Sequence, residues 1–294
     1  MDLLDLLDLS QSVIDGVLFG TTYSLIGIGF TLIFGVMHKI NLSYAAASIG
    51  AAYLSLIVVT AVPTPLVYAS AAVMGGVLGW LIYLICFRFI PLNNPLATLM
   101  STVGMLLAIE ELISHLTYGM PQNYPALFAS SNFEIGQFFL RGDLIFVFGL
   151  GCVAMVLLMQ LLKRTRLGLA TRAVAQQPVA AQLCGMSVNN TNASTFIIAG
   201  LLGGTAGAMA GAAIGVLSPL MTLPLTVKGL VVTVIGGLGS IEGAAIGALI
   251  VGLARAASVH IWPPAELFSI YVVMAAILVF KPEGLFQRTQ ARKI

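Results

Sequence analysis

Charge is the scarcest property of this 294-residue chain, because Asp, Glu, Lys and Arg together make up only 8% of it. None of the four occurs in residues 40–87, 89–109 or 173–227. A membrane-spanning helix needs about 20 apolar residues, so the longer of these stretches exceed a single span. With 59% hydrophobic residues, the chain holds more apolar surface than a soluble domain can cover. The sequence therefore predicts an integral membrane protein surrounded by lipid.

Cysteine, histidine and phosphate-binding motifs are equally sparse. Cys86 and Cys152 lie in apolar runs and Cys184 in a polar loop, which predicts no disulfide framework. No Lys follows a Gly, so the chain has no Gly-x-x-x-x-Gly-Lys loop for ATP. The three histidines have no metal-ligand spacing: His38, His115 and His260. We expect no catalytic residue, metal or cofactor in this chain, and its net charge of +2 gives no support for nucleic-acid binding.

Hydropathy, with proline and charge as boundaries, predicts eight helical spans. They cover residues 13–36, 42–62, 66–87, 95–118, 144–162, 194–217, 241–260 and 265–281. A ninth stretch, residues 225–238, is Gly-rich and short for one straight crossing, which predicts a broken or re-entrant element buried by protein. The expected fold is all-α, a single polytopic domain over residues 1–294 with about eight or nine transmembrane helices.

Basic residues in short loops predict the orientation in the membrane. The densest groups are Lys163, Arg164, Arg166 and Arg172, and then Arg288, Arg292 and Lys293. Placing both groups in the cytoplasm requires nine crossings, with the N-terminus and residues 119–143 outside. We expect residues 163–193 to form a cytoplasmic loop and 282–294 a cytoplasmic tail. Residues 1–12, with Asp2, Asp5 and Asp8 in place of a signal peptide's basic residues, predict a retained interfacial helix.

Glycines recur at helix-packing intervals in several spans. The ladders are Gly203, Gly207, Gly211 and Gly215, then Gly239, Gly243 and Gly247, and in the first span Gly16, Gly20, Ser24, Gly27, Thr31 and Gly35. They predict close helix contacts and a buried first span, although such ladders occur in many polytopic proteins. A further run predicts a hinge, unwound carbonyls at a cavity, or an ordinary turn between spans: Gly236, Gly237, Gly239 and Ser240.

Polar side chains at membrane depth are candidates for a solute path, because their burial in lipid is costly. They are Asn41, Ser43, Tyr44, Thr98, Ser101, Thr102, Glu110 and Lys228. All but Ser43 and Tyr44, which present hydroxyls at the start of the second span, also have a plainer interpretation. Asn41 caps a helix, the hydroxyls on the fourth span bond to their own carbonyls, Glu110 lies at a helix end, and Lys228 extends to the surface.

The loop RTRLGLATRAVAQQPVAAQLCGMSVNN lies within the longest polar segment on the predicted cytoplasmic side. Pro178 suits the first position of a helix and Gly185 the position just past its end. The sequence predicts a short helix whose Ala-rich face suits a protein groove, the alternative being a connecting helix resting on the membrane. The expected docking residues are Arg166, Gly168, Arg172, Pro178, Ala181, Leu183 and Gly185.

Five segments together carry a family resemblance. They are GVLFGTTYSLIGIGFTLIFGVMHKIN from Gly16, LATLMSTVG from Leu96, residues 166–185, VKGLVVTVIGGLGSIEGAAIGALIVGL from Val227, and KPEGLF from Lys281. In these segments the chain resembles the permease subunits of branched-chain and hydrophobic amino-acid ABC importers, especially the shorter of their two paired permeases.

The resemblance implies a permease of the bacterial inner membrane that works by alternating access. It implies a second permease subunit, two cytoplasmic ATPase subunits that use ATP and Mg, and a periplasmic solute-binding protein received by residues 119–143. The helix from Pro178 to Gly185 looks like the coupling helix that enters a groove in an ATPase. The chain itself is then not an enzyme.

One departure concerns the solute. After Asn41, such permeases usually read Phe-Ala-His-Gly, whereas residues 42–45 here read Leu-Ser-Tyr-Ala. If this position touches the solute, the cargo is urea, a short amide or another small amino acid rather than a branched-chain one. Two further alternatives stay open: a self-sufficient carrier or channel for a small solute, and a structural membrane subunit without a solute path.

Overall fold

The computed structural model describes residues 3–58, 64–90, 95–125, 132–135, 138–261 and 265–286, and it is almost entirely helical. The α-helices are α1 (Leu3–Met37), α2 (Tyr44–Val58), α3 (Thr64–Ile82), α4 (Pro95–Thr117), α5 (Gly142–Arg164), α6 (Arg166–Gln176), α7 (Pro178–Leu183), α8 (Val188–Ile214), α9 (Thr222–Gly236), α10 (Ile241–Ile261) and α11 (Glu266–Phe280). A π-helix, Tyr83–Arg88, continues α3, and a 3-10 turn, Pro219–Met221, precedes α9. The predicted all-α membrane fold is confirmed.

Seven helices in the described part of the chain are long and apolar enough to cross a membrane, and two shorter apolar helices accompany them. The two shorter ones are Tyr44–Ile57 and Glu266–Phe280. The Gly-rich ninth stretch, for which we expected a broken or re-entrant element, lies mostly in α9. This helix is unbroken over its 15 residues. Its glycines are used for packing: a side chain at Gly229 would lie 2.7 Å from Ile26 and Phe30 of α1. The backbone departs from helical geometry only after the end of α9, at Gly237 and Gly239.

α1 forms the centre of the molecule, as the predicted burial of the first span requires. Ile26 and Ile28 are fully buried, and Gly16 lets α1 approach α10 so closely that a side chain there would lie 2.7 Å from Ala256. The helix runs without a break from Leu3 to Met37, so residues 3–12 form its first turns, and their position at the membrane interface stays a prediction. Nothing in residues 3–15 breaks a helix, since neither Pro nor Gly occurs there.

Glycines on two faces of α8 pack closely against neighbouring helices. Gly200 and Gly204 pack on the backbone of α3 at Gly75, while Gly203 and Gly207 face Ser48 of α2. Gly243 of the second ladder meets the backbone of Gly236, between α9 and α10. The predicted close helix contacts are therefore present.

Two pairs of short antiparallel strands form in the segments between helices. β1 (Gln122–Asn123) pairs with β4 (Val216–Leu217), and β2 (Asn132–Ile135) forms a hairpin with β3 (Phe138–Arg141). Beside β1, burial raises the pKa of Tyr124 to about 12, although its hydrogen bond with Ser55 opposes the shift. These strands were not predicted, because pairs this short leave no alternating pattern in the sequence.

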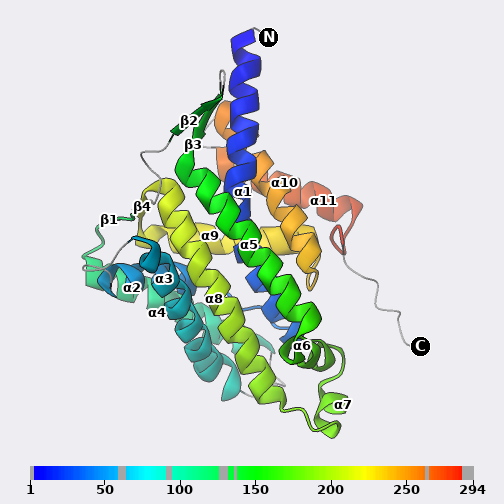
Figure 1. Ribbon diagram of the computed structural model, residues 1–294. Coiled ribbons are helices and arrows are strands. Elements are labelled where there is room, and N and C mark those ends of the chain that lie inside the picture. Colours follow the sequence, from blue (N-terminus) through cyan, green and yellow to red (C-terminus); the bar gives the residue numbers. More distant parts are fainter. Residues whose placement is uncertain are drawn as a thin grey trace.

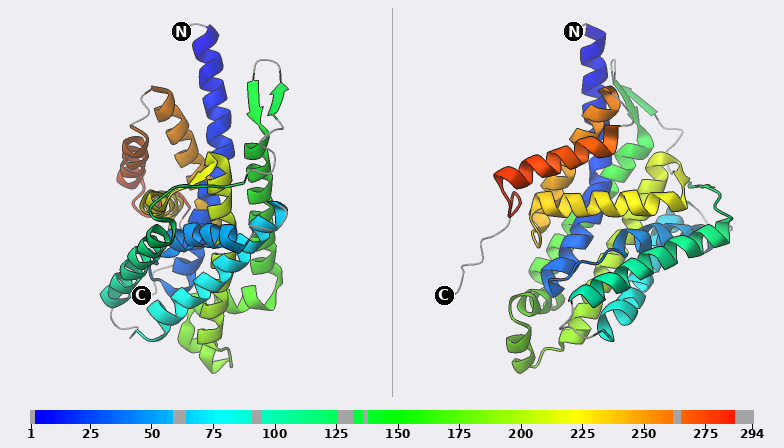
Figure 2. Two further views of the ribbon diagram at one scale, coloured as in Figure 1. Left: turned by 90° about the vertical axis from the view of Figure 1, so that its left-hand side faces the viewer. Right: turned by 180° about the vertical axis from the view of Figure 1, so that it is seen from behind.

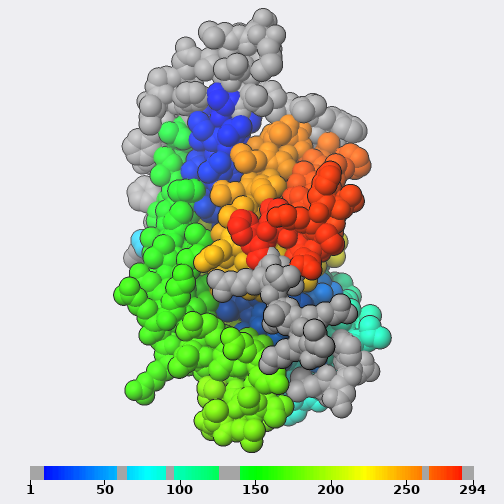
Figure 3. Space-filling model, turned by 90° about the vertical axis from the view of Figure 1, so that its right-hand side faces the viewer, coloured from blue at the N-terminus to red at the C-terminus, as the bar shows by residue number. Residues whose placement is uncertain are grey.

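The molecule has two distinct ends. The β2–β3 hairpin and the start of α1 lie at one, called here the hairpin end, and α6 and α7 at the other, the α7 end (Figures 1 and 2). α8 runs from the α7 end toward the hairpin, and α9 crosses α1 at a steep angle (Figure 2). Figure 3 shows α10 and α11 side by side on one face, with the α6–α7 segment at the lower end. The basic residues of the expected tail, Arg288, Arg292 and Lys293, lie outside the described residues.

Candidate functional site

A cavity of about 180 Å³ opens where α8 ends and α9 begins. By volume it has room for on the order of ten water molecules. Its wall is mostly apolar and comes from α1, α2, α8, α9 and the turn before α9: Phe19, Tyr23, Ile49, Ala210, Ile214, Leu220, Met221, Pro224, Leu225 and Lys228. Lys228 supplies the charge among these lining residues.

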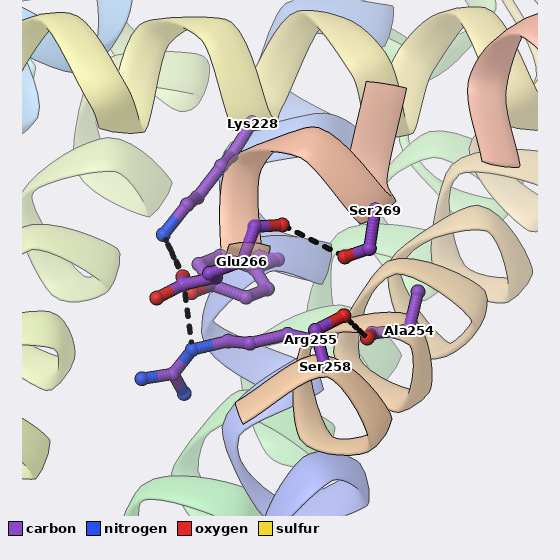
Figure 4. Close-up of polar contacts among 7 residues, drawn as sticks. Lys228, Ala254, Arg255, Ser258, Glu266 and Ser269 are labelled. Atoms are coloured by element: carbon purple, nitrogen blue, oxygen red, sulfur yellow. Dashed lines mark hydrogen bonds and ion pairs between the residues drawn. The ribbon is translucent and has the colours of Figure 1, made fainter. Parts of the chain in front are cut away.

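Lys228 takes part in a charged cluster beside this cavity. Its Nζ lies 2.5 Å from Oε1 of Glu266 and 3.3 Å from the hydroxyl of Tyr23. Arg255 Nε donates to the same Glu266 oxygen at 3.1 Å, so two cations from different helices meet at one carboxylate (Figure 4). The guanidinium of Arg255 also covers the ring of Phe19 at 4.2 Å. Lys228, only 14% exposed, therefore points to Glu266 rather than to the surface.

Sequence reasoning selected Lys228 but missed the three other members of the cluster, Tyr23, Arg255 and Glu266. Arg255 carried a usable signal, since it lies inside the apolar span 241–260 and a charge at that depth requires a partner. Glu266, at the start of the next span, was the nearest acidic residue along the chain. Tyr23 had no such signal, because a tyrosine in an apolar helix is ordinary.

A second polar group surrounds the linker between α1 and α2. Asn41 Oδ1 accepts hydrogen bonds from Ser43 N at 3.2 Å and from Ser43 Oγ at 2.7 Å, so it caps the turn that leads into α2. The Tyr44 hydroxyl donates to Ala199 O on α8 at 2.9 Å, and its ring packs against Phe30. Asn41 and Tyr44 line a separate cavity of about 10 Å³, which is at the lower limit for one water.

α4 is attached to this linker through two threonines. Lys39 Nζ donates to Thr98 Oγ1 at 3.0 Å, and Leu42 N donates to Thr102 Oγ1 at 3.4 Å. Thr102 Oγ1 also donates to Leu99 O at 2.8 Å, which is the expected bond to a carbonyl of its own helix, and its place on a solute path stays a prediction. Burial lowers the pKa of Lys39 below its ordinary value.

The other candidates on α4 point elsewhere. Ser101 is half-buried, and its carbonyl accepts from Cys86 Sγ at 3.6 Å. Glu110 Oε2 accepts from Thr222 Oγ1 at 2.6 Å, which joins α4 to the first residue of α9. The eight predicted path residues thus do not form one seam in the described structure. Five surround the linker, and Lys228 alone lines the larger cavity.

α7 is the short helix predicted from Pro178 to Gly185. Pro178 is its first residue, and Gly185 follows its end with φ of 81°. Gly185 N donates to Gln182 O at 2.9 Å and Met186 N to Ala181 O at 3.0 Å, the bond pair that ends a helix at a left-handed glycine. The sequence therefore located this helix and both of its boundary residues.

The residues of α6 and α7 divide into an outer and an inner set. Val179 and Leu183 are 66% and 86% exposed. Ala181 is buried against Val36 of α1 and Val174 of α6, so it seats α7 on the chain and does not face outward. Its expected place on the docking surface changes because it lies on the opposite side of the helix from Leu183.

Gly168 and the two arginines lie at the start of the same segment. A side chain at Gly168 would overlap the backbone of Leu162, so this glycine permits the tight turn from α5 to α6. Its N–H donates to Thr165 Oγ1 at 3.2 Å. Arg166 and Arg172 are exposed, and Arg172 Nε donates to Gly168 O at 3.3 Å.

The predicted hinge region is a turn between α9 and α10. Gly237 has φ of 98° and Gly239 has φ of 93°, whereas Gly236 is still helical. The turn is held from outside, because Leu285 N donates to Ile235 O and Phe286 N to Gly236 O. Whether it also bends during function stays a prediction.

Within the described residues, no group of three His, Cys, Asp or Glu is placed to hold a metal ion. The fold is that of a multi-pass helical membrane protein with a mostly apolar cavity where α8 ends and α9 begins, and with a short exposed helix, α7.

Comparison with known proteins gives the family. Residues 12–280 match the family described as branched-chain amino acid transport system, permease component, and the chain belongs to it. The high-affinity branched-chain amino acid transport system permease proteins BraD of Pseudomonas aeruginosa and LivH of Escherichia coli are each 27% identical to it, over 97% of this chain and 97% of their own. Among solved structures, PsaBC from Streptococcus pneumoniae in complex with Fab is similar in fold, with TM-score 0.51, 15% identity, and 92% and 89% of the two chains covered.

Proposed function

We propose that this chain is the translocation subunit of an ABC importer that carries branched-chain or other small apolar amino acids into the cytoplasm by alternating access. The observation that carries the proposal is the exposure of α7 in a chain of this permease family. Val179 and Leu183 of this short helix face outward, away from the rest of the chain. An exposed apolar helix face of this size suits a groove in a protein partner.

A chain of contacts leads from α7 toward the cavities. Ala181 packs on Val36 near the end of α1, and Lys39, just past that end, donates to Thr98 of α4. Tyr44 then connects the start of α2 to α8. A displacement of α7 by ATPase closure therefore acts first on the end of α1 and from there on α2, α4 and α8.

The proposal includes the partners and the orientation. Two ATPase subunits, which use ATP and Mg, bind at the α7 end in the cytoplasm, and a second permease subunit completes the path. A periplasmic solute-binding protein docks at the hairpin end. The N-terminus is periplasmic, the C-terminus is cytoplasmic, and the membrane is the bacterial inner membrane, as the basic loop residues favour.

Urea or a short amide is the alternative cargo, and the departure at residues 42–45 is the observation behind it. Tyr44 lines the small cavity, whereas the larger one has apolar walls and Lys228. Apolar walls suit an aliphatic side chain better than they suit urea. This favours amino acids.

The test is uptake by the chain reconstituted in liposomes with its cognate permease, ATPases and binding protein. We expect ATP-dependent accumulation of leucine, isoleucine or valine, and none of urea or acetamide at equal concentration. Accumulation of urea or acetamide without that of the amino acids would replace the proposed cargo.

A further inference from the structure

The ammonium group of Lys228 has a hydrogen-bond donor to spare. It carries three N–H donors, and two are directed at Glu266 and Tyr23. The structure describes no acceptor for the third, and Lys228 lines the 180 Å³ cavity. The charged residue of the cavity lining therefore stands among mostly apolar ones.

The cluster can release Lys228 without leaving Glu266 unpaired. Arg255 Nε already donates to the same Glu266 oxygen at 3.1 Å, from the side of α10 (Figure 4). Asp15, on α1, accepts a hydrogen bond from Gln11 Nε2 at 3.3 Å and is near enough to Arg255 and Arg141 to feel their charges. Removing one partner of a buried ion pair is costly when a bare charge remains. Here Glu266 keeps a cation, so an arriving anion can take Lys228.

We propose that Lys228 binds the carboxylate of an apolar amino acid whose side chain lies in this cavity, and that Glu266 then stays paired with Arg255 alone. The assignment deepens the proposed function and rests on it for the class of solute. Ile49, Leu220 and Leu225 supply an apolar wall. The volume is below the roughly 300–1,000 Å³ of sites for drug-sized ligands, which suits a solute of amino-acid size.

The test uses two probes that differ in charge and hardly in shape: 4-methylpentanoate and its amide. Binding to the full-length chain in lipid nanodiscs is measured by saturation-transfer NMR. We expect the wild type to prefer the acid. Lys228→Gln should weaken binding of the acid on the order of 10- to 100-fold, the loss of a charge-assisted hydrogen bond, and leave the amide unchanged. Lys228→Arg, which keeps the charge, should retain most of the preference.

A charge exchange separates solute binding from a merely structural ion pair. The double variant Lys228→Glu/Glu266→Lys keeps opposite charges at the two positions but places a carboxylate in the cavity. We expect it to bind the acid as poorly as Lys228→Gln does.

Three results would overturn the assignment: recovery of acid binding in the double variant, equal acid binding by wild type and Lys228→Gln, or no preference for the acid in the wild type. Failure of amino-acid uptake by the assembled transporter, with acid binding at Lys228 intact, would instead contradict the proposed function alone.

Discussion

At the scale of single residues, the contact between α3 and α8 depends on glycines. Gly75, Gly200 and Gly204 bring the two backbones together, and a side chain on Gly204 would overlap the Ala71 carbonyl. Such contacts are a main source of helix association in lipid, where burial of apolar surface gives little drive.

Gly204→Ala is therefore expected to destabilise the fold, by about 1–3 kcal/mol as for other overpacked sites. Gly149→Ala is the matched control, because Gly149 lies in α5 with open space where a side chain would stand. Alanine favours a helix over glycine by about 0.5–1 kcal/mol, so the control should be neutral or slightly stabilising. Thermal unfolding in one detergent compares the two. Equal melting temperatures would contradict the packing argument.

The sequence could identify the polar residues at membrane depth, but it could not predict their hydrogen-bond partners. Lys228, Asn41 and Glu110 stood out because polarity at membrane depth is costly. Their partners lie at very different separations: Asn41 bonds to Ser43 in the same turn, whereas Glu110 bonds to a residue 112 positions away. Long-range contacts follow from how the helices pack, which no local pattern records.

At the scale of elements, α7 has one exposed face and one face buried against the rest of the chain. Leu183 points outward, and Ala181 rests against Val36 and Val174. The exposed face is available for a partner, and the buried face fixes α7 on α1.

Leu183→Asp is expected to reduce ATPase co-purification by tenfold or more, on the order of the loss of one buried apolar anchor. The protein should remain in the membrane with an unchanged melting temperature, because Leu183 has few contacts within the chain. Gln182→Asp, which adds the same charge on the flank of α7, serves as the control. Equal recovery of ATPase with Leu183→Asp and wild type would contradict docking through this face.

Ala181→Trp is expected to act differently, because the larger ring would have to displace Val36 or Val174. We expect both a lower melting temperature, for a loss of about 1–3 kcal/mol, and loss of ATP-driven uptake. A variant that melts and transports as the wild type does would show that α7 is not seated on α1.

Elements with local signals were predicted well from the sequence, and those set by packing were not. Pro178 and Gly185 defined α7 because a helix start and a helix end need those residues locally. The glycines of α9 predict a broken or re-entrant element, whereas α9 is one unbroken helix. Gly229 instead makes room for Ile26 and Phe30 of α1, a reason visible only once the helices are together. α1 is continuous from Leu3 because neither Pro nor Gly occurs in residues 3–15 to break it.

At the scale of the whole molecule, the chain has a cavity of about 180 Å³ where α8 ends and α9 begins. It also has a short exposed helix, α7, at the α7 end (Figure 1). Contacts through α1, α4 and α8 connect these regions. The chain belongs to a permease family, and we infer that its motive force comes from separate ATPases through α7.

The most direct test of this account is leucine uptake into liposomes that contain the chain with its cognate permease, with and without the ATPase subunits. The binding protein is supplied outside and ATP inside. The account predicts accumulation against a gradient only when the ATPases are present, and its loss with Leu183→Asp. Accumulation of leucine by liposomes that lack any ATPase subunit would contradict it.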